Sequence, residues 1–93
     1  MVETANLELY TIEKLKYGYK VPFVYVRYIS CNHPENNYVG KAKVINANSV
    51  NITLRPINRP TFFITMDYDG CETNEAKIIG ENEIISIFKL KQT

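Results

Sequence analysis

Short runs of β-branched and aromatic residues, repeated at intervals of about ten positions, are the feature that most limits how this chain can fold. Such residues fit a pleated sheet better than a helix. The runs cover residues 21–29, 38–45, 49–55, 61–67, 76–79 and 84–90, and turn-forming residues separate them. Short strands at this spacing are typical of a small barrel or sandwich, and closure into a barrel removes exposed edges. We therefore expect a mainly β fold, a five- or six-stranded barrel.

The size of the chain fits a single domain. Its 93 residues are 45% apolar and 23% charged, which is enough apolar material to fold and too little net charge to remain disordered. We expect one small β-barrel domain over residues 1–93. Apolar residues in 6–17 follow a spacing that is partly helical and partly strand-like, and Gly18 comes next, so a short N-terminal helix is also expected.

The segment from Tyr38 to Arg55 predicts a β-hairpin. Residues 49–55 alternate, which places Val50, Ile52 and Leu54 on the buried face. Asn46, Ala47 and Asn48 make the connection tight, because Asn tolerates positive φ and can hydrogen-bond its own backbone. Gly40, inside the first strand of the hairpin, indicates a bend or a close backbone approach.

Charge and hydropathy limit the classes of partner. Eleven basic residues stand against ten acidic ones, so any binding of nucleic acid depends on a local cluster of charge. No apolar run approaches the roughly 18 residues of a membrane span. The acidic N-terminal segment lacks the features of a secretory signal, and we expect a cytoplasmic protein. Cys31 and Cys71 are then expected as free thiols, with a disulfide between two loops as the alternative.

Enzymatic and metal-binding functions find little support. Cys31 and His33, with Asp67, Asp69 and Cys71 elsewhere, have the side chains of a mixed metal site, but their spacing matches no established zinc pattern. A nucleophilic enzyme needs a base beside its nucleophile, and His33 is the single histidine. The sequence has no Gly-rich phosphate loop. We expect no catalytic residue, no metal and no cofactor.

Two stretches resemble the Sm-like (LSm) family of SH3-like barrels. The stretch from Tyr38 to Leu54 is similar to the first Sm motif, in which a glycine-bearing strand turns through polar residues into an Asn-containing apolar strand. The stretch from Lys77 to Ile87 is similar to the second, where a glycine turn joins the last two strands. Ile79 stands where the family places an arginine that helps hold a nucleotide.

This resemblance implies an oligomeric scaffold on single-stranded RNA. The turns at residues 46–49 and 80–82 would then lie together at the rim of a ring. The implied RNA contacts are made by Asn46, Asn48, Asn51, Gly80 and Asn82. The alternative is a protein-interaction or structural barrel that assembles through a strand edge such as residues 61–66, without nucleic acid.

Aromatic and basic residues are the other candidates for RNA contact. Seven tyrosines offer stacking surfaces for bases, although Tyr25 and Tyr28 fall on opposite faces of one strand. Lys41, Lys43, Arg55 and Arg59 could form a modest basic face on the hairpin. Its alternative is an ordinary solvated face, balanced by Glu72, Glu75, Glu81 and Glu83.

Overall fold

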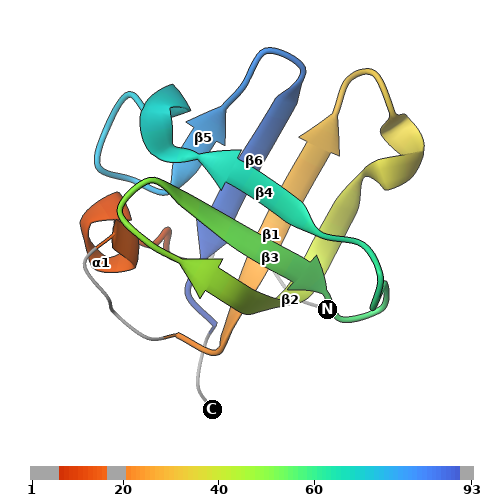
Figure 1. Ribbon diagram of the computed structural model, residues 1–93, viewed down its shortest axis with the longest axis horizontal. Helices are drawn as coiled ribbons and strands as arrows, with labels where there is room; N and C mark the ends of the chain where they lie inside the picture. Colours follow the sequence, from red (N-terminus) through yellow and green to blue (C-terminus); the bar gives the residue numbers. More distant parts are fainter. Residues whose placement is uncertain (1–6, 17–20, 91–93) are drawn as a thin grey trace.

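Six antiparallel strands form one sheet that curls into a nearly closed barrel (Figure 1). The computed structural model describes residues 7–16 and 21–90. The strand order is β4-β3-β2-β1-β6-β5, which is compatible with an SH3-like or Sm-like fold. This arrangement confirms the mainly β barrel expected from the sequence. The strands are β1 (Phe23–Ser30), β2 (Tyr38–Ala47), β3 (Asn51–Pro56), β4 (Ile64–Asp67), β5 (Lys77–Ile79) and β6 (Glu83–Phe88).

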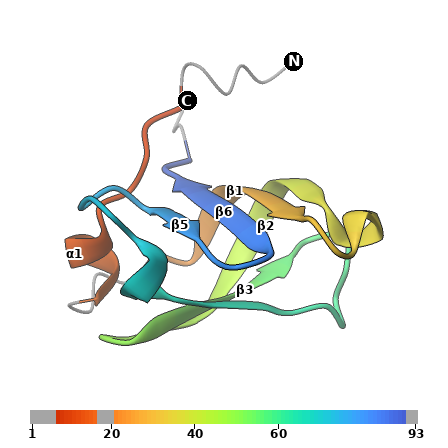
Figure 2. The same ribbon diagram turned by 90° about the horizontal axis from the view of Figure 1, so that it is seen from above.

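The core fills the space between two layers of the barrel. Figure 2 shows β1, β5 and β6 on one side and β3 on the other, with helix α1 (Ile12–Lys16) at one end. In β1 the residues alternate, so that Val24, Val26 and Tyr28 are buried and the intervening side chains point outward. Further fully buried side chains come from β3, β5 and β6, namely Ile52, Leu54, Ile78, Ile85 and Ile87.

The N-terminal segment is part strand and part helix. Leu9 pairs with Phe88, and the Tyr10 N–H donates to the Ile87 carbonyl oxygen over 3.0 Å. The chain becomes helical only at Ile12, and the helix has five residues. The short helix expected from the sequence is confirmed over Ile12–Lys16, and the strand-like part of the segment corresponds to Leu9 and Thr11, which bridge to Phe88 and Glu75. Gly18, expected to stop the helix, lies outside the described residues.

The predicted hairpin of β2 and β3 is confirmed with two corrections. Asn46 and Ala47, expected in the connection, belong to β2, and no non-glycine residue of the described chain has the positive φ expected of the turn asparagines. Val50, expected in the core, is 62% exposed. The reason is the turn before β3, in which the side-chain oxygen of Asn48 accepts hydrogen bonds from the N–H groups of Val50 and Asn51 over 2.8 and 2.9 Å. Val50 therefore belongs to the turn, and the buried alternation of β3 starts at Ile52.

Gly40 marks the close approach that its position in a strand suggested. Its φ of +154° suits glycine, and a Cβ atom there would lie 2.9 Å from the Tyr38 hydroxyl oxygen. That hydroxyl donates to the Lys41 carbonyl oxygen over 2.6 Å. The tyrosine ring thus covers the backbone of its own strand.

Candidate nucleic-acid interface

The outward side of β1 and its neighbours carries a continuous set of side chains. Residues directly opposite each other in an antiparallel pair share one face of the sheet. Phe23, Tyr25 and Arg27 stand opposite Lys43, Lys41 and Val39 of β2. These rows continue through the other strand pairs. On one side β1 pairs with β6, which pairs with β5 and with Leu9; on the other side β2 pairs with β3. We call the whole set the outer face: Leu9, Phe23, Tyr25, Arg27, Ile29, Val39, Lys41, Lys43, Arg55, Lys77, Ile79, Ile84, Ser86 and Phe88.

Charge on the outer face is of one sign. It holds five cations, and none of the nine acidic residues that the structure describes belongs to it. Among the described residues, the ion pairs are Glu8 with Lys89 and His33 with Glu35, so no acidic partner neutralises the five. The near-neutral chain therefore has a polarised surface, which attracts anions locally.

The cations follow a diagonal across the strands. Lys43 lies in the row of Phe23, Lys41 in the next row with Tyr25, and Arg27 in the row after that. Lys77 continues the row of Arg27 on the far side of Ser86. The aromatic rings of Phe23, Tyr25 and Phe88 lie on one side of this diagonal. The isoleucines Ile29, Ile79 and Ile84 lie on the other side.

The rings of the outer face contact each other and a cation. Tyr25 and Phe88 meet edge to face, with ring centroids 6.3 Å apart, and the Lys41 ammonium lies 4.6 Å from the centroid of Phe23. Tyr28 points the other way, into the barrel, where its ring lies near Phe62. The prediction that Tyr25 and Tyr28 occupy opposite faces is confirmed.

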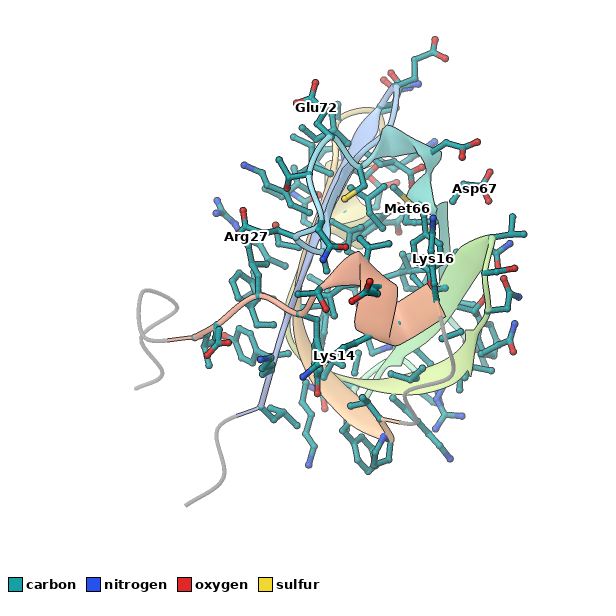
Figure 3. All side chains as sticks on the ribbon, turned by 90° about the vertical axis from the view of Figure 1, so that its left-hand side faces the viewer. Lys14, Lys16, Arg27, Met66, Asp67 and Glu72 are labelled. Atoms are coloured by element: carbon teal, nitrogen blue, oxygen red, sulfur yellow. The ribbon has the colours of Figure 1, made fainter. Side chains whose placement is uncertain are left out.

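Figure 3 shows Arg27 on the outer side of the sheet, while α1 with Lys16 and the β4 residue Met66 lie on the other side. The Lys16 ammonium there lies 5.6 Å from the ring centroid of Tyr68. Lys16 therefore provides a cation remote from the outer face.

The five residues that the sequence proposed for RNA contact fall into two separate groups. Phe23, which begins β1, pairs with Lys43, so the turn after β2 lies beyond the start of β1. Ser30, which ends β1, pairs with Glu83, so the turn between β5 and β6 lies beyond its end (Figure 1). The structure does not bring these turns together at one rim, because β5 and β6 form a tight hairpin at the other end of β1.

The asparagines at the turn between β2 and β3 differ in whether their side chains are hydrogen-bonded within the turn or exposed to solvent. The Asn48 side chain is engaged in the turn and also donates to the Asn51 side-chain oxygen over 3.4 Å. Asn46 is exposed and stands opposite Thr53, beyond the row of Lys43 and Arg55. Asn46 therefore lies at the margin of the outer face.

Asn82 and Gly80 belong to the other group. The Gly80 N–H donates to the Glu83 carbonyl oxygen over 2.7 Å, and the Asn82 carbonyl oxygen accepts from the Cys31 N–H over 2.8 Å. Asn82 also lines a polar hollow at the end of β1, together with Asn32, His33 and Asn36. Its main-chain oxygen is thus engaged in a structural hydrogen bond at the edge of the hollow.

The basic cluster predicted on the hairpin is only partly assembled. Lys41, Lys43 and Arg55 belong to the outer face, but Arg59 does not. The Arg59 guanidinium donates to the Asn36 carbonyl oxygen over 3.2 Å and lies 5.6 Å from the ring centroid of Phe62. The glutamates expected to balance the cluster do not belong to the rows of the outer face.

Sequence reasoning missed Arg27, Lys77 and Phe88 as members of this face. They come from three strands, and only the long-range register of β1 with β6 and of β6 with β5 places them together. The period-two pattern of β1 gave a partial signal, because it puts Tyr25 and Arg27 on one side.

No protein-family model, curated protein or solved structure matches the chain. No helix among the described residues is long and apolar enough to cross a membrane. Within residues 7–16 and 21–90, no three His, Cys, Asp or Glu side chains form a group that could hold a metal ion. Cys31 and Cys71 are free thiols, the first exposed and the second half-buried.

Proposed function

We propose that this protein is a non-enzymatic module that binds single-stranded RNA on its outer face. The observation that carries the proposal is the diagonal of five unneutralised cations beside the rings of Phe23, Tyr25 and Phe88. Cations contact phosphates and aromatic rings stack with bases, and their combination is typical of surfaces that bind single strands. Stacking contributes about 1–3 kcal/mol per base.

A single strand fits this face better than a duplex does. The aromatic side chains lie on a sheet and can stack only with bases that are unpaired and splayed outward. Asn46 at the margin supplies an amide that can read the edge of a base. The proposed site therefore keeps Asn46 from the sequence interpretation and moves the centre of binding from the two turns to the sheet.

The proposal is tested by fluorescence anisotropy with a labelled uridine-rich RNA of about 12 nucleotides, at two or more salt concentrations. We expect log K to fall with log salt by about 0.7 per phosphate contacted. The double variant Lys41→Gln/Lys43→Gln should bind at least about tenfold more weakly and show a slope shallower by about one to two. Tyr25→Ala should weaken binding without changing the slope.

Lys16→Gln is the matched control for the single variant Lys41→Gln, because each removes one positive charge and Lys16 lies on the other side of the sheet. Its affinity for RNA should stay within about twofold of the wild-type value, given that long-range interactions are screened over about 10 Å. Absence of RNA binding by the wild-type chain, or an equal loss in all variants, would contradict the proposal.

Assembly through strand edges is the second candidate function, with or without RNA. It is favoured by the sheet order, which leaves β4 and β5 unpaired with each other as the two edge strands. Thr65 is exposed on β4, whereas Ile64 is buried, so Thr65→Lys blocks the edge without opening the core. Light scattering on size-exclusion chromatography should give a smaller mass for this variant if the chain forms oligomers through β4. An unchanged mass would exclude β4 as the assembly edge.

A further inference from the structure

A hollow lies on the outer face, between the rows of Tyr25 and Ile29. Leu9, Phe88, Ile29 and Ile84 line its apolar sides, and Arg27, Lys77 and Ser86 supply its polar groups. The hollow is open and has a volume of about 340 Å³. This volume is at the small end of the range for ligand sites, which begins at about 300 Å³.

Ser86, which has a short side chain, lies in the hollow between the long side chains of Arg27 and Lys77. Arg27 and Lys77 are each paired with Ser86, one from β1 and one from β5. Their backbones are therefore roughly 10 Å apart, twice the spacing of neighbouring strands, and both side chains reach the hollow between them. Such a gap suits a phosphate group, whose oxygens can accept hydrogen bonds from both cations.

The hydroxyl of Ser86 adds a third donor. Ser86 is 9% exposed and lines the hollow between the two cations. Like charges that share one face of a sheet repel each other, so an anion between Arg27 and Lys77 relieves a cost that the empty face carries.

We infer that this hollow is a seat for a single nucleotide, with its phosphate between Arg27 and Lys77 above Ser86 and its base against Phe88 and Leu9. The inference rests on the proposed function, of which it names one subsite. The wall of Phe88 and Leu9 adjoins Tyr25, so the base lies on the aromatic flank of the cation diagonal. The shape and charge of the hollow suit any nucleotide, so we expect no preference for one base.

The test is an NMR titration of the full chain with uridine monophosphate, uridine and inorganic phosphate. We expect uridine monophosphate to shift the amide signals of Arg27, Lys77 and Ser86 and to bind more tightly than either fragment. Lys77→Gln should weaken this binding at least about threefold, because it removes a charged donor. Ser86→Val fills the floor of the hollow with a residue that suits a strand, and should also weaken it.

Lys43→Gln separates this inference from the proposed function. Lys43 lies on the diagonal but outside the hollow, so its substitution should weaken RNA binding and leave the affinity for uridine monophosphate unchanged. If RNA binds but Lys77→Gln and Ser86→Val leave mononucleotide binding unchanged, the nucleotide seat is wrong and the proposed function stands. If inorganic phosphate binds as tightly as uridine monophosphate, the role of Phe88 and Leu9 is wrong. If RNA itself does not bind, the proposed function fails.

Discussion

Gly70 and Ile79 approach so closely that a Cβ atom on Gly70 would lie 3.0 Å from the carbonyl carbon of Ile79 and closer still to its oxygen. Gly70 ends the short 3₁₀ helix η3 (Tyr68–Gly70), which follows β4, and Ile79 ends β5. Because β4 and β5 are the unpaired edges of the sheet, this contact joins the two sides of the barrel where no ladder does. It also covers the end of β5, which leaves β4 as the better edge for strand addition.

Gly70→Ala should therefore destabilise the protein. The added methyl group meets backbone atoms, which cannot rotate away, so η3 or β5 must shift. Overpacking of this kind costs about 1–3 kcal/mol. The measurement is urea denaturation followed by circular dichroism, with the free energy of unfolding extrapolated to water.

Gly80→Ala is the control for that measurement. A Cβ atom on Gly80 would find its nearest neighbours at 3.5 and 3.6 Å, which is ordinary van der Waals contact. We expect a change within about 0.5 kcal/mol. Equal losses for the two variants would show that the Gly70 contact has no special role in closing the barrel.

Two buried tyrosines should respond in opposite directions to removal of their hydroxyl groups. The Tyr68 hydroxyl is buried and has no hydrogen-bond partner among the described residues, so Tyr68→Phe should stabilise the protein by about 1 kcal/mol. The Tyr28 hydroxyl donates to the Glu83 carboxylate, and Tyr28→Phe should destabilise it by a similar amount. Thermal unfolding at neutral pH compares both variants with the wild type, and a loss of stability in Tyr68→Phe would contradict the assignment.

Stability should also fall at alkaline pH because of the same two side chains. Burial raises the pKa of Tyr28 to about 12, helped by the hydrogen bond to Glu83, and burial raises the pKa of Tyr68 to about 12. In the unfolded chain the pKa of a tyrosine is about 10. The unfolded state then binds fewer protons than the folded state, so the free energy of unfolding falls as pH rises from about 10 to 12.

The measurement is chemical denaturation of the wild type and of the double variant Tyr28→Phe/Tyr68→Phe at about pH 9 and about pH 11.5. Lysines and the exposed tyrosines titrate in both proteins, so the difference between the two slopes isolates Tyr28 and Tyr68. The wild type should lose more stability over this interval. Parallel losses would mean that these two phenols keep ordinary pKa values.

The sequence predicted the strands well because their signal is local. Alternation of buried and exposed residues, as at Ile52 and Leu54, identifies a strand without knowledge of its neighbours. The outer face was beyond such reasoning, because the contact of Tyr25 with Phe88 depends on the pairing of β1 with the last strand. The resemblance to Sm motifs led to the two turns, whereas the cations and rings gather on the sheet between them.

Asn48→Ala should affect stability more than binding. The Asn48 side chain accepts hydrogen bonds from two N–H groups of its own turn, in the manner of a helix or turn cap. Its loss should cost about 1 kcal/mol of stability, as capping substitutions do. RNA affinity, measured well below the unfolding temperature, should change by less than about twofold. A large loss of RNA affinity with unchanged stability would indicate that the turn, and not the outer face, is the binding site.

Arg59→Ala should likewise weaken the fold and spare RNA binding. The Arg59 guanidinium donates to the Asn36 carbonyl oxygen and lies over the rings of Tyr38 and Phe62, so it fastens the loop before β2 to the segment before β4. Loss of a charged donor and of ring contacts should cost about 1–3 kcal/mol. Arg59→Lys should not restore the stability fully, because an ammonium lacks the planar fork of donors.

Lys41→Gln should give the opposite pattern, weaker RNA binding with little change in unfolding temperature, since its ammonium is exposed on the outer face. If Arg59→Ala lowered RNA affinity as much as Lys41→Gln, the basic cluster first expected from the sequence would be the binding site after all.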